Sequence, residues 1–371
     1  MSVKRNFVNV GQALFAIEER NGKTIVYDCG GEAPQVIPAV LPYVLKENSV
    51  IDILFISHYD KDHIHGIQHL LMHCSVRHIV LPMLEHVCRF IPLLNMPYYS
   101  FEYEFTLNPQ MAIQDTFEFL RSSLGRHDGE YRDREFIEPQ IHYVEKSDEG
   151  YNEVNLERPV LIDNLRSDQT ISSRSAIRID SLDDWVYLPY NRRLMTQNEE
   201  REFFNILGVP YGCSDDEFLY HWRHNWPNEK LGMPFGNHNY YNRNLIKEAW
   251  SIATHISLKE INDFSMTLYS GHAYINAKEG CLYTGDYNAK KYIDELIRYY
   301  KPIWDKIGVV QVPHHGSKNN FDSKLIIPSA THVISNKEFP YRRSDVKYQN
   351  VWYEIMHSGE KVVGTWQEPL C

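Results

Sequence analysis

Long apolar runs, a signal peptide and cysteine pairs are all missing from this chain of 371 residues. Its longest largely apolar run is Val50–Ile56, which Asp52 interrupts, whereas a membrane-spanning helix needs about 20 such residues. The N-terminal residues lack the apolar centre of a secretory signal. The six cysteines include no CxxC pair, which indicates reduced thiols rather than a disulfide framework. These absences predict a cytoplasmic protein without a membrane anchor.

Internal repeats and low-complexity tracts are also absent, so a solenoid or a disordered chain is excluded. The composition is that of an ordinary globular protein, with 43% hydrophobic and 23% charged residues. The length allows one large domain or two. A net charge of −11 argues against non-specific coating of nucleic acid, although it leaves room for a local basic groove.

Alternating strand and helix patterns at both ends of the chain predict an α/β fold. In the N-terminal part, residues 23–31, 50–58 and 77–81 are β-branched apolar runs typical of strands, and residues 33–46 and 65–74 are typical of helices. The pattern returns at Ser265. The later segments that predict strands are SMTLYS, GCLYTGD, GVVQVPHH and THVIS, and NAKKYIDELIRYY predicts an amphipathic helix.

The middle of the chain, residues 97–260, differs from both ends in composition and in secondary-structure pattern. It is rich in aromatic residues and mixed charge and shows few clear strands. Residues 198–208 and 243–256 predict helices, and residues 227–243 predict an irregular loop. The simplest organisation is a core of residues 1–96 and 261–371 with an insertion, residues 97–260, of mixed helix and loop. A second domain is the alternative.

The stretch from Ser57 to Gly66 carries the strongest chemical signal. His58, Asp60, Asp62 and His63 follow a predicted strand and precede a predicted helix. Alternating side chains can point to one side there, and His63 can join them. Carboxylates this close repel each other unless a cation lies between them. The stretch therefore indicates a metal site, and the alternative is a solvated acidic loop in which Asp62 caps the helix.

This stretch resembles the HxHxDH signature of the metallo-β-lactamase fold, in the HxDxDH form of the corresponding domain of ComEC-type DNA-uptake proteins. The resemblance covers about residues 5–95 and 260–367 and skips the middle. It implies an αββα sandwich with a large insertion. Other segments resemble the family in the same order, namely Asn9–Gln12, Tyr27–Gly31, Asn262–Leu268, Leu282–Asp286, Val312–Lys318 and Val362–Thr365.

The resemblance also implies a site for two divalent metal ions. Its ligands would be His58 and Asp60 for one ion, Asp62 and His63 with one of His314 and His315 for the other, and Asp286 as the bridge. Asp28 would orient these ligands through hydrogen bonds. The histidine of the pair that does not coordinate would contact substrate or protonate the leaving group. Asp60 replaces the usual second histidine, so Mn²⁺ becomes a rival to Zn²⁺.

Two departures from the family pattern concern the metal ligands. Residues 185–189 contain no histidine, although many family members have a further ligand of the first ion there. Water, or a histidine of the insertion such as His221 or His238, would then fill the position. His65 stands where the family usually has glycine, and it is interpreted as a helix-start residue without a role.

The remaining candidates concern substrate. Lys318, Arg342 and Arg343 are candidate phosphate-binding residues, although the two arginines are equally consistent with a solvated basic loop. Residues 218–226 interleave aromatic and cationic side chains. Such a pattern is typical of single-strand stacking platforms, and packing of an added subdomain or a partner interface explains it as well.

The resemblance implies hydrolysis of a phosphodiester by a hydroxide shared between the two ions, with nucleic acid as the expected substrate. One alternative is a phosphodiesterase for a small molecule, either a cyclic nucleotide or a phosphorylated head group. Another is a partner-gated effector or scaffold subunit that binds a protein through residues 97–260.

Overall fold

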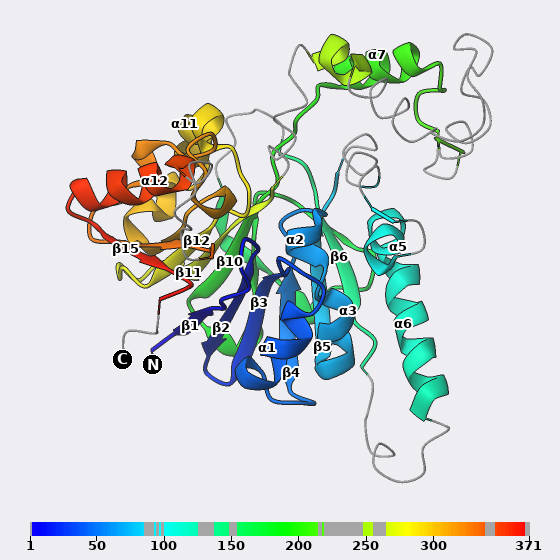
Figure 1. The fold of residues 1–371 in the computed structure, drawn as a ribbon, viewed down its shortest axis with the longest axis horizontal. Coiled ribbons are helices and arrows are strands. Elements are labelled where there is room, and N and C mark those ends of the chain that lie inside the picture. Colours follow the sequence, from blue (N-terminus) through cyan, green and yellow to red (C-terminus); the bar gives the residue numbers. More distant parts are fainter. Residues whose placement is uncertain are drawn as a thin grey trace.

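Two β-sheets lie face to face, and helices cover their outer faces (Figure 1). This is the predicted αββα sandwich. The computed structural model describes residues 2–84, 93, 96–97, 100–124, 137–147, 154–213, 217–218, 248–254, 265–337 and 346–367.

The first sheet has seven strands in the described part of the chain, in the order β1-β2-β3-β4-β5-β6-β8. The first three strands pair antiparallel, and the strands from β3 to β8 run parallel. Their bounds are β1 Lys4–Phe7, β2 Phe15–Arg20, β3 Lys23–Cys29, β4 Val50–Phe55, β5 Ser75–Pro82, β6 Gln140–Val144 and β8 Thr170–Ile171.

The second sheet has eight strands among the described residues, in the order β15-β14-β13-β12-β11-β10-β9-β7. Strands β12 to β15 run parallel, whereas β11 pairs antiparallel with both β10 and β12. Their bounds are β7 Asn155–Leu161, β9 Ser175–Arg178, β10 Trp185–Tyr190, β11 Thr267–His272, β12 Gly280–Tyr283, β13 Ile307–Gln311, β14 Thr331–Ile334 and β15 Lys361–Gly364.

Helices cover each sheet because one face of every helix is apolar. In α11, for example, Ile293 and Leu296 are buried against the second sheet, and the side chain of Asn288 caps the first turn. The helices on the first sheet and beyond it are α1 Val36–Val44, α2 Lys61–Ile64, α3 Ile67–His73, α5 Phe101–Leu107, α6 Pro109–Leu124 and α7 Gln197–Leu207; those on the second are α11 Ala289–Tyr299 and α12 Val346–His357. Short 3₁₀ turns are Ile162–Asn164, Asp180–Leu182, Lys301–Lys306, His314–Gly316 and Ser323–Leu325.

Apolar side chains from both sheets form one buried cluster in the space between them. Phe55 and Tyr27 of the first sheet and Tyr187 and Tyr283 of the second are buried there, and Tyr27 stacks on Tyr283 with ring centroids 4.8 Å apart. This packing fixes the two sheets relative to each other. The loops at their carboxyl ends are therefore held on a rigid support.

The strands and helices predicted at both ends of the chain are confirmed, but residues 97–260 differ from the prediction of helix and loop. This segment supplies β6 and β8 to the first sheet and β7, β9 and β10 to the second. Its predicted helix at residues 198–208 is α7, and residues 248–254 are helical. The predicted loop at residues 227–243 lies outside the described residues. Whether the rest of the segment forms a subdomain stays a prediction.

None of the helices in the described ranges has the length and apolar character that a membrane crossing requires.

Candidate metal centre

The carboxyl ends of four strands bring the candidate ligands together. Asp28 is the penultimate residue of β3, and the loop from His58 to His63 follows the neighbouring parallel strand β4. Asp286 follows β12, and His314 and His315 follow the neighbouring parallel strand β13. Because parallel strands end at the same edge of a sheet, the two pairs of loops meet across the sandwich.

Asp28 holds the first histidine of the centre in place. Its Oδ2 accepts a hydrogen bond from Nδ1 of His63 at 2.7 Å, and its two oxygens accept the backbone N–H and the hydroxyl of Ser57 at 2.7 Å each. A carboxylate can only accept here, so His63 carries its proton on Nδ1. In the neutral ring that a metal ligand requires, Nε2 would then carry the lone pair that binds the ion.

His58 is oriented by two hydroxyl groups. Its Nδ1 lies 2.9 Å from Oγ of Ser57 and 3.1 Å from Oγ of Ser265. Ser265 also accepts the backbone N–H of Asp286 at 2.8 Å. The same serine thus links the loop after β4 to the loop after β12.

His315 is held in the same way from the second sheet. Its Nδ1 donates to the carbonyl of Ser335 at 2.9 Å, and its Nε2 lies 3.2 Å from Oδ2 of Asp62. The backbone of His314, His315 and Gly316 has φ angles of 48°, 54° and 84°. This left-handed conformation costs a non-glycine residue about 1–3 kcal/mol, and such strained positions cluster at functional sites.

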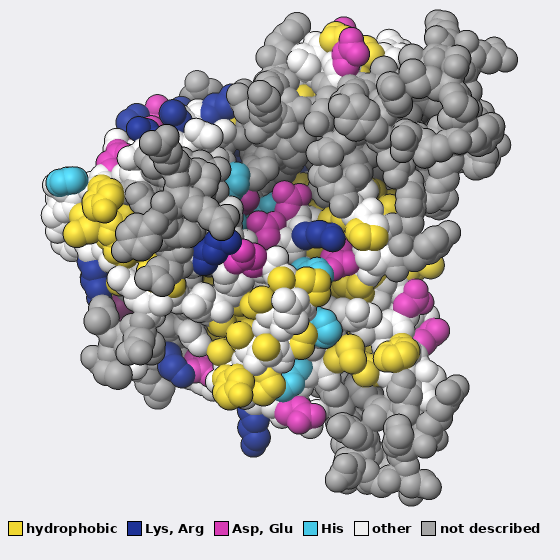
Figure 2. Space-filling model, in the orientation of Figure 1, with side chains coloured by type: hydrophobic (Ala, Val, Ile, Leu, Met, Phe, Trp, Pro, Cys, Tyr) yellow, Lys and Arg dark blue, Asp and Glu magenta, His cyan; other side chains and the backbone are white. Residues whose placement is uncertain are grey.

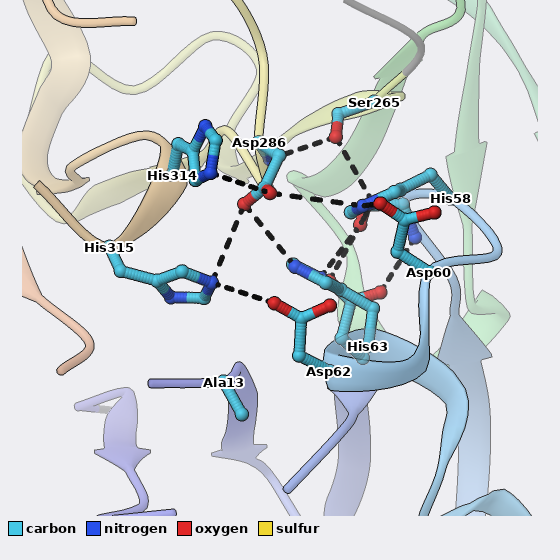
Figure 3. A network of polar contacts seen from close by, with 12 residues as sticks. Ala13, His58, Asp60, Asp62, His63, Ser265, Asp286, His314 and His315 are labelled. Atoms are coloured by element: carbon cyan, nitrogen blue, oxygen red, sulfur yellow. Dashed lines mark hydrogen bonds and ion pairs between the residues drawn. The ribbon is translucent and has the colours of Figure 1, made fainter. Parts of the chain in front are cut away.

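Asp286 stands between the four histidines (Figure 3). Its Oδ1 lies 3.3 Å from Nε2 of His63 and 3.7 Å from Nε2 of His315. Its Oδ2 lies 4.0 Å from Nε2 of His58 and 3.7 Å from Nε2 of His314. Each carboxylate oxygen therefore faces a different pair of histidines, as a ligand that bridges two ions would.

The donor set fits divalent metal ions. Asp62, His63, Asp286 and His315 place one ligand atom each within 4.8 Å of one another. The Nε2 atoms of His58 and His63 are buried and have no hydrogen-bond partner among the described residues. A buried nitrogen without a partner is costly, and a cation in front of Asp286 would remove that cost.

Proton affinities in the centre are strongly perturbed by burial and by close charges. Burial and the neighbouring His63 lower the pKa of His58 to about 3, so this ring is neutral. Burial, together with Asp62 and Asp286, raises the pKa of Asp60 to about 7. Burial also raises the pKa of Asp62, but the hydrogen bond with His315 and the charge of His63 reverse this and lower it to about 2. Such crowding of acidic groups favours a cation.

One side of the centre is open to solvent. The side chains of Asp60, Asp62 and His314 are 32%, 36% and 25% exposed, whereas His63 is fully buried. Figure 2 shows acidic and histidine side chains gathered near the middle of one face, with lysine or arginine side chains on either side. These three side chains are therefore the part of the centre that solvent reaches.

The structure thus brings together all the residues predicted as metal ligands, along with Asp28, and it contradicts the alternative of a solvated loop capped by Asp62. The residue at the N-cap of α2 is Asp60, and its side chain makes no capping bond. Lys318 is exposed and makes no hydrogen bond or ion pair with any described residue. The predicted candidates that lie outside the described residues are Arg342, Arg343, His221 and His238, together with most of the stretch 218–226.

Three further side chains, which the sequence alone does not reveal, position the ligand loops from a distance. The buried amide of Gln311 accepts the backbone N–H groups of Thr284 and Gly285 at 2.7 and 2.8 Å, which fixes the turn before Asp286. Ser335 and Ser265 act as described above. The one available signal was a polar residue inside an apolar strand, as in the run GVVQV that contains Gln311.

Comparison with known proteins finds one family model and distant structural similarities. Residues 10–105 match the model of the metallo-beta-lactamase superfamily. Among solved structures, the metallo-beta-lactamase fold protein YhfI from Bacillus subtilis is 10% identical, with a TM-score of 0.38 over 98% of this chain and 96% of that one. Human tRNase Z, short form, is 11% identical, with a TM-score of 0.32 over 88% of this chain and 80% of that one. No curated protein matches the chain.

Proposed function

Starting from a chain with the metallo-β-lactamase fold, we propose that this protein is a hydrolase that uses two divalent metal ions to cleave phosphodiesters. The observation that carries the proposal is the position of Asp286, whose two oxygens face different pairs of histidines. The superfamily whose model matches residues 10–105 consists largely of metal-dependent hydrolases. The finer resemblance to ComEC-type domains stays a prediction.

We assign the ligands to two groups around Asp286. Asp62, His63 and His315 surround Oδ1, and His58, Asp60 and His314 surround Oδ2. In this assignment His314 and His315 both coordinate, one on each ion. The sequence alone predicted that only one of the two does. His314 also supplies the third side-chain ligand that residues 185–189 lack.

Two cations held in this way would supply Lewis acidity, which activates water and neutralises charge on a phosphate group. The chain's own residues prepare the site for them. Asp28 and Ser335 keep the Nδ1 protons of His63 and His315 turned away from the centre. The exposed edges of Asp60, Asp62 and His314 leave one side open for a phosphate.

Nucleic acid is the substrate that we propose. The support is the resemblance of the motifs to those of ComEC-type domains, together with the open face beside the ligands. Hard oxygen ligands in both groups suit Mn²⁺ as well as Zn²⁺. The alternatives to a nucleic-acid substrate are a small-molecule phosphodiester and a partner-gated role. The following experiment distinguishes among the three.

The test is cleavage of labelled single- and double-stranded DNA, RNA and bis-p-nitrophenyl phosphate in the presence of Mn²⁺ or Zn²⁺. We expect polynucleotide cleavage that disappears in the Asp62→Ala, His63→Ala double variant, because that variant loses two ligands of one ion. Metal content by elemental analysis, measured alongside, shows whether the double variant has lost an ion.

Cleavage of the small diester alone would replace the nucleic-acid substrate with a small molecule. Two bound ions without turnover of any substrate would contradict the enzymatic proposal and favour a partner-gated or scaffold role. Equal cleavage by the double variant would show that the activity does not come from this centre.

A further inference from the structure

His65 lies in the stretch from Ser57 to Gly66, but the proposed function assigns it no role. It follows α2 directly and lies two residues after His63. Its Nδ1 lies 2.5 Å from Oε1 of Glu102, and both side chains are largely buried, with 15% and 9% exposed. The prediction that His65 has no role therefore misses a close contact with the first turn of helix α5.

Glu102 is well placed to hold this contact. It lies in the first turn of α5, where the side chain of the N-cap residue Ser100 accepts the backbone N–H of Tyr103. A negative charge is favourable there because of the helix dipole. Burial raises the pKa of Glu102, but hydrogen bonds from His65 and nearby groups more than reverse this and lower it to about 2. The carboxylate is therefore charged at neutral pH and accepts the proton of His65 Nδ1.

A second contact joins the same helix to the other end of the ligand loop. Tyr59 lies between His58 and Asp60 and is 2% exposed. Its ring packs on Phe105 of α5 with centroids 6.0 Å apart, and Phe105 is fully buried. Buried residues of α3, α5 and α6 share one apolar cluster, and Figure 1 shows α5 leading into α6. One short helix thus contacts the loop on both sides of the run from Asp60 to His63.

The position of α5 in the chain makes this contact informative. The helix belongs to residues 97–260, the segment predicted as an insertion, and Glu102 is far from His65 in the sequence. The contact therefore ties this segment to the ligand loop only in the folded chain.

We propose that helix α5 braces the metal-ligand loop, with Glu102 and Phe105 as positioning residues that set the spacing of the ligands through His65 and Tyr59. This proposal rests on the two-ion site of the proposed function. It assigns the segment 97–260 a direct part in building the centre.

The test is a double-mutant cycle on the full chain with Glu102→Gln, His65→Gln and the combined variant. Mn²⁺ affinity is measured by competition with a chelator, and the Mn²⁺ spectrum is recorded by electron paramagnetic resonance. We expect Glu102→Gln to weaken Mn²⁺ binding by about tenfold, since supporting residues around metal sites have effects of this size. In the His65→Gln background the same change should have no further effect.

Glu104→Gln is the matched control, because it removes the same charge from the same helix and its side chain makes no hydrogen bond or ion pair with any described residue. Phe105→Leu tests the second contact if Glu102→Gln does not fold. Unchanged Mn²⁺ affinity and spectrum in folded Glu102→Gln, with only a lower melting temperature, would overturn the brace. A wild-type protein that binds neither Mn²⁺ nor Zn²⁺ would instead overturn the proposed function.

Discussion

Replacing Asp286 with asparagine is expected to abolish phosphodiester cleavage and to reduce the number of bound ions from two to one or none. The amide keeps one oxygen but turns the other position into a donor, which faces the Nε2 atoms of His63 and His315 or of His58 and His314. We expect the cleavage rate to fall on the order of 10³-fold or more, because charge stabilisation by the centre is lost. The measurements are single-turnover cleavage and elemental analysis.

The control for this variant is Asp294→Asn, which removes a carboxylate that is 73% exposed and paired with Lys324 on the surface. Burial raises the pKa of Asp286, but the charges of His314, His63 and His315 reverse this and hold it well below its usual value. Metal-free Asp286→Asn should therefore be less stable than the metal-free wild type, because the variant loses these charge contacts. Full activity with two ions bound in Asp286→Asn would show that Asp286 does not bridge.

Replacing Gly30 with alanine is expected to unfold or displace the ligand loop. A Cβ atom at this position would lie 1.6 Å from the carbonyl oxygen of Asp62 and 2.5 Å from the backbone nitrogen of His63. Backbone cannot rotate away as a side chain can, so we expect a loss of about 3 kcal/mol or more in the free energy of unfolding. Urea denaturation of the metal-free protein measures this loss, and a metal titration tests whether binding is lost too.

The matched control is Gly31→Ala, at the next residue in the chain. Its Cβ would meet Cγ1 of Ile37 at 3.1 Å and the carbonyl oxygen of Ala33 at 3.4 Å, so that small shifts can accommodate it. We expect this variant to bind metal. Equal stability and equal metal affinity in the two variants would refute the idea that close backbone contact at Gly30 shapes the ligand loop.

The ligand loop could be predicted from the sequence because its donors are neighbours in the chain. His58, Asp60, Asp62 and His63 fall within one strand-to-helix connection, and the short motifs around Asp286 and His315 are equally local. The parallel strands before these motifs are apolar runs, so the meeting of the loops at one edge followed from the α/β pattern.

The supporting contacts could not be predicted because their partners are far apart in the sequence. Gln311 reaches the turn at Thr284, and Glu102 reaches His65, through contacts that only the folded chain creates. Gln311 differs from an ordinary polar side chain only in lying within an apolar run, and nothing in the local pattern of Glu102 distinguishes it at all.

The strands of residues 97–260 were missed for a different reason. β7 has an exposed, charged sequence, NLERPVL, and contains Pro159, while β9 has only four residues. Such short strands near a sheet edge lack the alternating apolar pattern that identifies a strand. The neighbouring β10 is fully buried but contains Pro189, which weakens the sequence signal for a strand.

The central claim is that Asp286 bridges two metal ions, and anomalous diffraction from crystals grown with Mn²⁺ tests it most directly. We predict two anomalous peaks, one between Asp286 Oδ1 and the group of Asp62, His63 and His315, and one between Oδ2 and the group of His58, Asp60 and His314. A single peak, or none, in crystals grown with excess Mn²⁺ and likewise in crystals grown with excess Zn²⁺ would contradict the two-ion centre.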